Sequence, residues 1–150
     1  MSKIMVIIPD VLSSIINKGE VTERYYNPGN YFSEVHIVLT NNDCPNINEV
    51  QKMAGNAKLF IYNLPDAKIM FFLSLGWRPL LLKWWLNKAI ELAKQIQPDI
   101  IRCHAAQLNS FAAAKIKKEL GIPYVVSLHI NPDEDVRGRA DSFIKKIVSY

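Results

Sequence analysis

The sequence lacks the residue patterns of several common protein classes. Two cysteines in 150 residues, Cys44 and Cys103, are too few for a disulfide framework, and neither has metal-ligand spacing. The opening MSKIMVIIPD is too short for a signal peptide and has no small-residue cleavage site. We therefore expect a cytoplasmic protein in which Cys103 is a small core residue rather than a reactive thiol.

Known catalytic and nucleotide-binding motifs are also missing. The sequence contains no GxGxxG or P-loop, and no HExxH or GxSxG, so serine catalysis and HExxH-type metal-dependent hydrolysis have no support. We expect neither a metal nor a cofactor. The formal net charge is +4, with eight basic residues against three acidic ones between positions 76 and 120. These basic residues form no aromatic-interleaved cluster, so no nucleic-acid partner is expected, although an anionic partner would meet the second half.

The hydrophobic pattern predicts an α/β fold with one domain over residues 1–150. Five strand-length apolar runs, rich in Ile and Val, are typical of strands buried on both faces of a parallel sheet: Lys3–Pro9, Glu34–Thr40, Lys58–Asn63, Asp99–Cys103 and Tyr124–Leu128. Helical periodicity starts at Leu81 and stops at Pro98, and a second helix is expected over Leu108–Leu120, before Gly121. Strands and helices in alternation predict a doubly wound, Rossmann-like sheet with strand order 3-2-1-4-5. Asn41–Gly55 stays ambiguous.

The most apolar stretch is Ile69–Leu86, interrupted by Gly76–Pro79 and by two basic residues. The interruption argues against a membrane span. One interpretation is a helical hairpin or kinked pair packed on the sheet. The alternative is a peripheral membrane contact, with basic side chains and bulky aromatic ones at the headgroup level; the aromatic residues concerned are Phe71, Trp77, Trp84 and Trp85.

Candidate binding residues follow the strands, because ligands of open parallel sheets bind beyond the carboxyl ends of the strands. After the first strand comes the turn Lys18-Gly19-Glu20, which either approaches a phosphate or is an ordinary turn. The fourth strand ends at His104, and the fifth leads into His129 and Asn131. An imidazole at this edge can donate to an anion or a sugar hydroxyl and exchange a proton near neutral pH. The sequence therefore predicts a site containing both histidines.

Two other segments are interpreted as structural. Thr40–Asp43, after the second strand, is expected to be a solvated loop. His36 lies inside its strand, so we predict that it contributes to stability rather than to chemistry.

The segment Pro98–Pro132, PDIIRCHAAQLNSFAAAKIKKELGIPYVVSLHINP, resembles the stretch of family 4 glycosyltransferases written PDxIHxH, a small-residue helix, then GIPxVxxxHG. The resemblance covers about a quarter of the chain. It implies the N-terminal half of a GT-B fold, in which two Rossmann-like domains face each other across a cleft. Such enzymes transfer a sugar from a nucleotide donor with retention and without a bound metal. Their N-terminal domain mainly holds the acceptor, and their C-terminal domain holds the nucleotide.

Carried over residue by residue, the resemblance gives His129 the position of the catalytic histidine beside the transferred sugar. His104 matches the last histidine of HxH, whose first histidine is replaced by Arg102, and Gly19 corresponds loosely to a glycine-rich turn near the donor phosphates. Asn131 stands with Pro132 where HG or HD is common. The family's ExxxxxxxE glutamates belong to the nucleotide-binding half, which we expect to be absent from this chain.

The resulting expectation is the acceptor-binding domain of a retaining glycosyltransferase of hexosyltransferase type, inactive alone. Its partners would be a nucleotide-sugar donor, a sugar or lipid-linked acceptor and a C-terminal GT-B domain. Two alternatives remain open. One is half of a GT-B-fold sugar-nucleotide 2-epimerase, which needs paired catalytic carboxylates, and the other is a non-catalytic α/β binding module.

Overall fold

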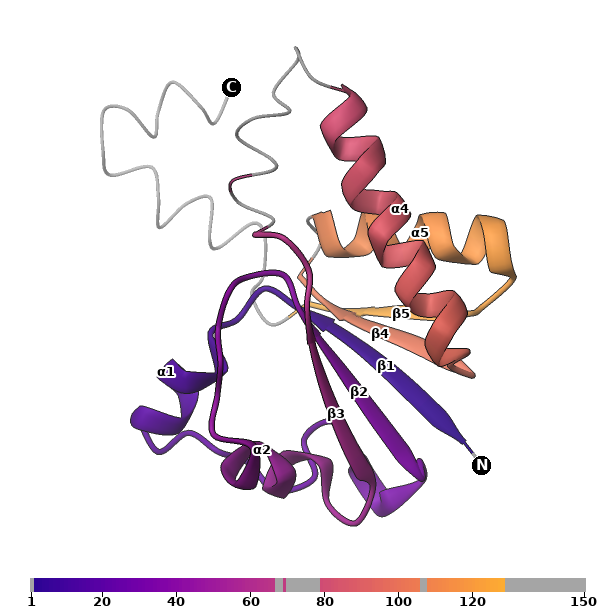
Figure 1. Cartoon of the computed structure of the whole chain (residues 1–150). Helices are drawn as coiled ribbons and strands as arrows, with labels where there is room; N and C mark the ends of the chain where they lie inside the picture. Colours follow the sequence, from indigo (N-terminus) through magenta and orange to yellow (C-terminus); the bar gives the residue numbers. More distant parts are fainter. Residues whose placement is uncertain (1, 67–68, 70–78, 106–107, 129–150) are drawn as a thin grey trace.

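Five parallel strands form one sheet at the centre of the computed structural model, which describes residues 2–66, 69, 79–105 and 108–128 (Figure 1). They are β1 (Lys3–Ile8), β2 (Glu34–Leu39), β3 (Lys58–Asn63), β4 (Ile100–His104) and β5 (Tyr124–Ser127). The order across the sheet is β3-β2-β1-β4-β5, which confirms the predicted topology. The crossover from β3 to β4 places β4 beside β1, so the order in which strands are added to the sheet reverses between these two central strands.

Helices cover both faces of the sheet. On one face lie α1 (Leu12–Asn17) and α2 (Ile47–Ala54), and on the other α4 (Pro79–Ile96) and α5 (Leu108–Leu120) (Figure 1). Strand β1 contributes side chains to the hydrophobic cores on both faces of the sheet. Ile4, Val6 and Ile8 pack with the α1 and α2 side, while Met5 and Ile7 pack against α4 and α5. Successive strand side chains point to opposite faces, so a continuous apolar strand buries itself twice.

The two long helices agree with their sequence patterns. Helix α5 has the predicted bounds, and α4 begins two residues before the predicted start at Leu81. The ambiguous stretch Asn41–Gly55 contains α2, whose N-cap is Asn46. The side chain of this asparagine accepts a hydrogen bond from the backbone N–H of Asn48. The short helix α1 was not predicted; it has only six residues, too few for a periodic signal.

Two predicted structural residues occupy the expected positions. Cys103 is fully buried in β4, and burial raises the pKa of its thiol to about 11, so it is an inert core residue. His36 is 4% exposed within β2. Its ring stacks on Phe60 with 4.6 Å between ring centroids, and its Nε2 lies 3.0 Å from the Glu34 carboxylate.

The proposed aromatic membrane contact requires a correction. Trp85 is fully buried between α4 and the sheet, and its indole N–H donates to the Pro65 carbonyl at 2.8 Å, so it faces no membrane. Trp84 is 45% exposed. Phe71 and Trp77 lie outside the described residues. Among the helices that the structure describes, none is long and apolar enough to cross a bilayer.

Candidate functional site

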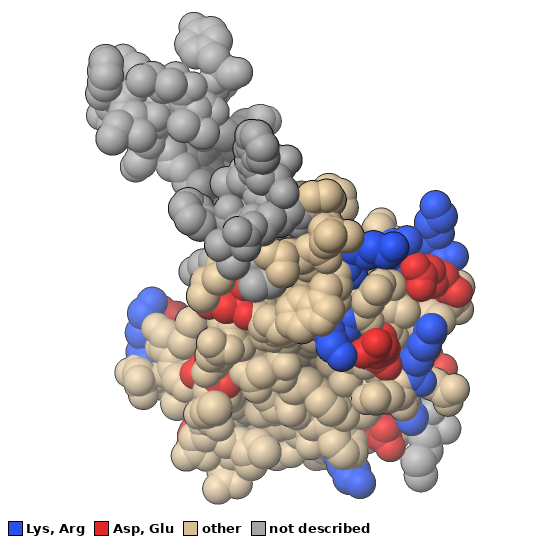
Figure 2. All heavy atoms as spheres, turned by 45° about the horizontal axis from the view of Figure 1, so that its top comes forward, with Lys and Arg blue, Asp and Glu red and all other residues tan. Residues whose placement is uncertain are grey.

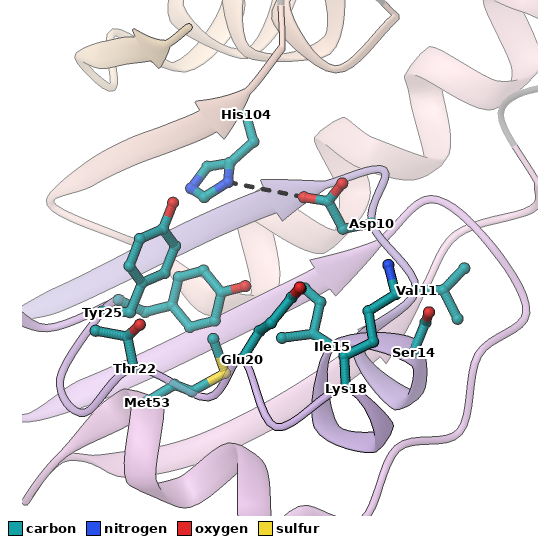
Figure 3. Close-up of a pocket in the computed structure, with 11 residues that line it drawn as sticks. Asp10, Val11, Ser14, Ile15, Lys18, Glu20, Thr22, Tyr25, Met53 and His104 are labelled. Carbon is teal, nitrogen blue, oxygen red and sulfur yellow. Dashed lines mark ion pairs between the residues drawn. The ribbon is translucent and has the colours of Figure 1, made fainter. Parts of the chain in front are cut away.

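A pocket of about 520 Å³ opens at the carboxyl ends of β1 and β4 (Figure 3). Its walls come from the segment after β1, from the loop that precedes β2, and from single residues of α2 and β4. The lining residues are Asp10, Val11, Ser14, Ile15, Lys18, Glu20, Thr22, Tyr25, Tyr26, Met53 and His104. The pocket thus lies between β1 and β4, where the strand order of the sheet reverses, which is the position at which open parallel sheets bind ligands.

His104 and Asp10 form the polar rim of the pocket nearest the sheet. The Nδ1 atom of His104 lies 4.0 Å from the Asp10 carboxylate, an ion pair when the imidazole is protonated (Figure 3). The side chain of His104 is 3% exposed, whereas that of Asp10 is 50% exposed. Asn109 of α5 donates to the His104 carbonyl at 2.9 Å and fixes the strand end. A buried imidazole beside a solvated carboxylate is a group that can exchange a proton with a ligand.

Two adjacent tyrosines form the aromatic wall. The rings of Tyr25 and Tyr26 lie edge to face at 5.1 Å, and both lie within 6 Å of the His104 ring. Burial raises the pKa of both phenols, and the Asp10 carboxylate adds to the increase at Tyr26. Both hydroxyl groups are therefore protonated at neutral pH and able to donate as well as accept hydrogen bonds.

Arg102 attaches this aromatic wall to the sheet. Its Nη1 donates to the Tyr25 carbonyl at 3.1 Å, its Nε donates to Ser127 Oγ at 3.0 Å, and its guanidinium lies 5.3 Å from the Tyr25 ring centroid. The amide N–H of Tyr26, in the same peptide unit as the Tyr25 carbonyl, donates to the Met53 carbonyl at 2.9 Å. One peptide group is thus held from β4 on one side and from α2 on the other.

Asn27 anchors the rest of the same loop. It is fully buried, and its side-chain amide donates to the carbonyls of Phe32 and Ala54 while its oxygen accepts from the Phe32 amide. A buried amide whose hydrogen bonds are satisfied specifies one loop conformation. The wall is therefore part of the folded domain rather than a loose flap.

The turn Lys18-Gly19-Glu20 is the C-terminal end of α1. Gly19 has a φ of +72°, its amide donates to the Ile16 carbonyl, and the Glu20 amide donates to the Ile15 carbonyl. This pair of bonds is the Schellman arrangement, which needs a left-handed residue at the position of Gly19. Both amides are thus engaged by the helix and do not point toward a ligand. Instead, the side chains of Lys18 and Glu20 line the pocket.

The loop after β2, predicted to be a solvated loop over Thr40–Asp43, also makes hydrogen bonds that hold the pocket residues in place. Asn41 donates to the carbonyls of Pro9 and Asp10 at 3.1 and 2.9 Å. The Asp43 carboxylate accepts from the amide and the hydroxyl of Ser13 at the start of α1. These contacts hold the β1–α1 connection, and with it Asp10, at the edge of the sheet.

The structure brings together some of the predicted site residues. Lys18, Glu20 and His104 line one pocket, and Gly19 lies between two of them in the turn. His129 and Asn131 lie outside the described residues, so their placement remains a prediction. The sequence reasoning missed Asp10, Thr22, Tyr25 and Tyr26. The adjacent tyrosines and the aspartate after the first strand were signals that could have suggested some of them.

The pocket combines carboxylates, hydroxyl groups, an ammonium group and two aromatic rings. Carboxylates and hydroxyls hydrogen-bond to the hydroxyl groups of a polyol, and aromatic rings cover its apolar C–H faces. Small-molecule sites with a few polar groups on an apolar base have this composition.

Comparison with known proteins gives one family match and a set of structural likenesses. The family model described as Glycosyltransferase Family 4 matches residues 33–150. No curated protein sequence matches the chain. Two crystal structures of the C-terminal domain of a hydrogenase from Pyrococcus furiosus are similar in fold. The first has a TM-score of 0.51 and 14% sequence identity, and the match covers 84% of this chain and 91% of the hydrogenase domain. The second has a TM-score of 0.50 and 15% sequence identity, and the match covers 83% of this chain and 89% of the hydrogenase domain. At this identity the likeness concerns the α/β fold alone.

Proposed function

Because the chain belongs to glycosyltransferase family 4, we propose that it is the acceptor-binding domain of a retaining glycosyltransferase with a nucleotide-sugar donor. The observation that carries the proposal is the pocket at the carboxyl ends of β1 and β4. Its mixture of protonated tyrosines, carboxylates and hydroxyl groups suits a saccharide. The two free cysteines, one exposed and one buried, are consistent with a cytoplasmic enzyme.

The donor nucleotide belongs, in this proposal, to a partner domain. The backbone amides of Gly19 and Glu20 close the end of α1, so this turn provides no cradle for a diphosphate. Stabilising a departing diphosphate requires donors preorganised around it in a site from which water is excluded. We therefore expect no sugar transfer by this chain alone and only weak binding of a nucleotide-sugar.

His129 and Asn131 complete the proposed site. They follow Leu128, the last described residue, in the segment after β5. In a two-domain enzyme containing this domain, His129→Ala should lower turnover by roughly 10²-fold, the scale for one positioned acid–base group, with a smaller change in acceptor affinity. A fully active His129→Ala enzyme would remove this residue from the proposal.

Blocking the pocket tests the acceptor-binding role. Ser14 lines the pocket from the exposed side of α1, so Ser14→Trp should fill its entrance without disturbing the core. We expect this variant to lose saturation-transfer NMR signals from methyl glycosides that bind the wild-type chain. The matched control is Asn87→Trp, at an exposed position of α4, which should keep them. Equal binding by both variants would place any saccharide outside the pocket.

A peripheral membrane contact is a second proposal, confined to the start of α4. Leu80 is 78% exposed and Trp84 is 45% exposed, one turn apart, and Lys83 is exposed between them. An apolar pair with a lysine is a typical interfacial anchor. On the face drawn in Figure 2, basic and acidic side chains are interspersed, which limits any long-range attraction to an anionic surface.

The lipid proposal has its own test. The chain should sediment with vesicles that contain anionic lipid, and the fraction bound should fall as salt is raised because the lysine contribution is screened. Trp84→Ala should reduce binding. Phe111→Ala, which removes a 69% exposed aromatic residue from α5, is the control. No sedimentation at low salt would withdraw the membrane contact and leave the pocket unaffected.

A further inference from the structure

The charges that line the pocket are unequal. Asp10 and Glu20 contribute two carboxylates, whereas Lys18 contributes the single ammonium among the lining residues that the structure describes. The charges of Asp10, Glu20 and Lys18 sum to one net negative charge. Figure 3 shows Lys18 and Glu20 rising from the turn after α1 toward Asp10 and His104, so a ligand would meet all of these groups.

Backbone groups do not compensate for this excess. Anions are usually held by free backbone amides at helix N-termini or in nests. Here α1 lines the pocket from its N-cap, Val11, to the turn at its C-terminal end. The Ser14 and Ile15 amides donate to the Val11 carbonyl, the Ser13 amide donates to Asp43, and the Gly19 and Glu20 amides donate to Ile16 and Ile15, so these amides are already engaged. The nearby cation Arg102 donates to the Tyr25 carbonyl and to Ser127, and it is not a lining residue.

Burial raises the phenol pKa of both tyrosines, and Asp10 and Arg102 then act in opposite senses on them. At Tyr26 the Asp10 carboxylate raises the pKa more than Arg102 lowers it, whereas at Tyr25 the lowering by Arg102 is the larger of the two. The field of the Asp10 carboxylate therefore outweighs that of Arg102 at Tyr26 only. An anionic ligand would meet one ammonium group, Lys18, against two carboxylates, whereas an ammonium ligand would gain a carboxylate partner.

We infer that the pocket selects an uncharged or amino-substituted saccharide and discriminates against phosphorylated sugars and uronic acids. This inference rests on the proposed acceptor role and specifies the acceptor's charge. Asp10 and Glu20 are the residues that set the preference, and Lys18 moderates it.

Four probes of similar size separate the possibilities: methyl α-glucoside, glucosamine, glucuronate and glucose 6-phosphate. Their dissociation constants would be measured by NMR titration of the full 150-residue chain at pH 7 and matched low ionic strength. The carboxylates are exposed, so the effect should be moderate. Glucosamine should bind at least as tightly as the glucoside, and the two anions about three- to tenfold more weakly. Raising the salt concentration should reduce the differences in dissociation constant between the charged probes and the neutral glucoside, because salt screens the carboxylates.

Substitutions of the two carboxylates test whether Asp10 and Glu20 cause the weaker binding of anionic sugars. Asp10→Asn combined with Glu20→Gln should remove the discrimination against the anionic sugars. The matched control is Glu91→Gln combined with Glu119→Gln, which removes two carboxylates paired with lysines on α4 and α5 and should keep the wild-type ranking.

The outcomes distinguish this inference from the proposed function. Anionic sugars that bind as tightly as the glucoside, or more tightly, would overturn the charge preference and leave the acceptor role standing. A ranking that survives the double pocket variant would overturn the assignment to Asp10 and Glu20. If none of the four probes binds, both the charge preference and the acceptor role fail.

Discussion

Replacing Arg102 with methionine should loosen the aromatic wall of the pocket. The change removes two charge-assisted donors, to Tyr25 and Ser127, and the contact of the guanidinium with the Tyr25 ring. Hydrogen bonds to charged groups contribute about 1.5–3 kcal/mol each, and an exposed cation–π contact contributes about 0.5–1 kcal/mol. These contributions are not additive and the site is partly solvated, so we expect a loss of about 2–3 kcal/mol in the free energy of unfolding.

Urea unfolding would measure the global change, and amide exchange would locate it. The Tyr26 amide shares a peptide unit with the Tyr25 carbonyl, so its protection should fall more than that of the Ile7 amide in central strand β1. Arg102→Lys should be intermediate, since one ammonium cannot reproduce the two-armed contact. The control Lys115→Met, which removes an exposed ion pair with Glu119, should cost under about 1 kcal/mol. An unchanged urea midpoint together with unchanged Tyr26 exchange in Arg102→Met would refute the reasoning.

Further predictions concern two glycines with positive φ, Gly55 after α2 and Gly121 after α5, and the buried His36. Gly55 has φ +64° and ψ −129°, and a Cβ there would overlap Asn30 and Arg24, so Gly55→Ala should cost roughly 2 kcal/mol or more by urea unfolding. Gly121→Ala, with a φ of +74° and open space around it, should cost only about 1 kcal/mol; equal costs would contradict the predicted overlap. Burial lowers the pKa of His36 despite its Glu34 partner, so the unfolded chain binds more protons below about pH 6.5 and the free energy of unfolding should fall toward pH 5. His36→Gln should flatten that slope, and a slope that survives the substitution would assign it to other groups.

The sheet could be predicted because its strands carry their own signal. Continuous Ile and Val runs closed by turn residues mark β1 and β2, and burial on both faces requires no knowledge of partners. Helix α5 could also be predicted, because its apolar stripe is followed by Gly121 and, two residues later, by Pro123. Boundaries elsewhere shifted by one or two residues, as expected for frayed ends.

Only some of the pocket residues could be predicted from the sequence, and the reason is physical. His104 could be placed because it ends a strand, and strand ends converge in a parallel sheet. The aromatic wall depends on contacts between residues far apart in sequence, such as Arg102 with the Tyr25 carbonyl, which no local pattern encodes. The same limitation applies to Gly19. A single glycine in a turn does not reveal whether the neighbouring amides face a ligand or the end of their own helix.

The most direct test of the acceptor-binding role is a residue-resolved titration of the isotopically labelled chain with a neutral methyl glycoside. Backbone amide shifts should move at Asp10, Tyr25, Tyr26 and His104, around the pocket at the carboxyl ends of β1 and β4. The amides of Lys3 and Glu34, at the amino ends of β1 and β2, should stay fixed. Shifts confined to the amino ends of the strands, or no shifts at saturating glycoside, would contradict the acceptor-binding role.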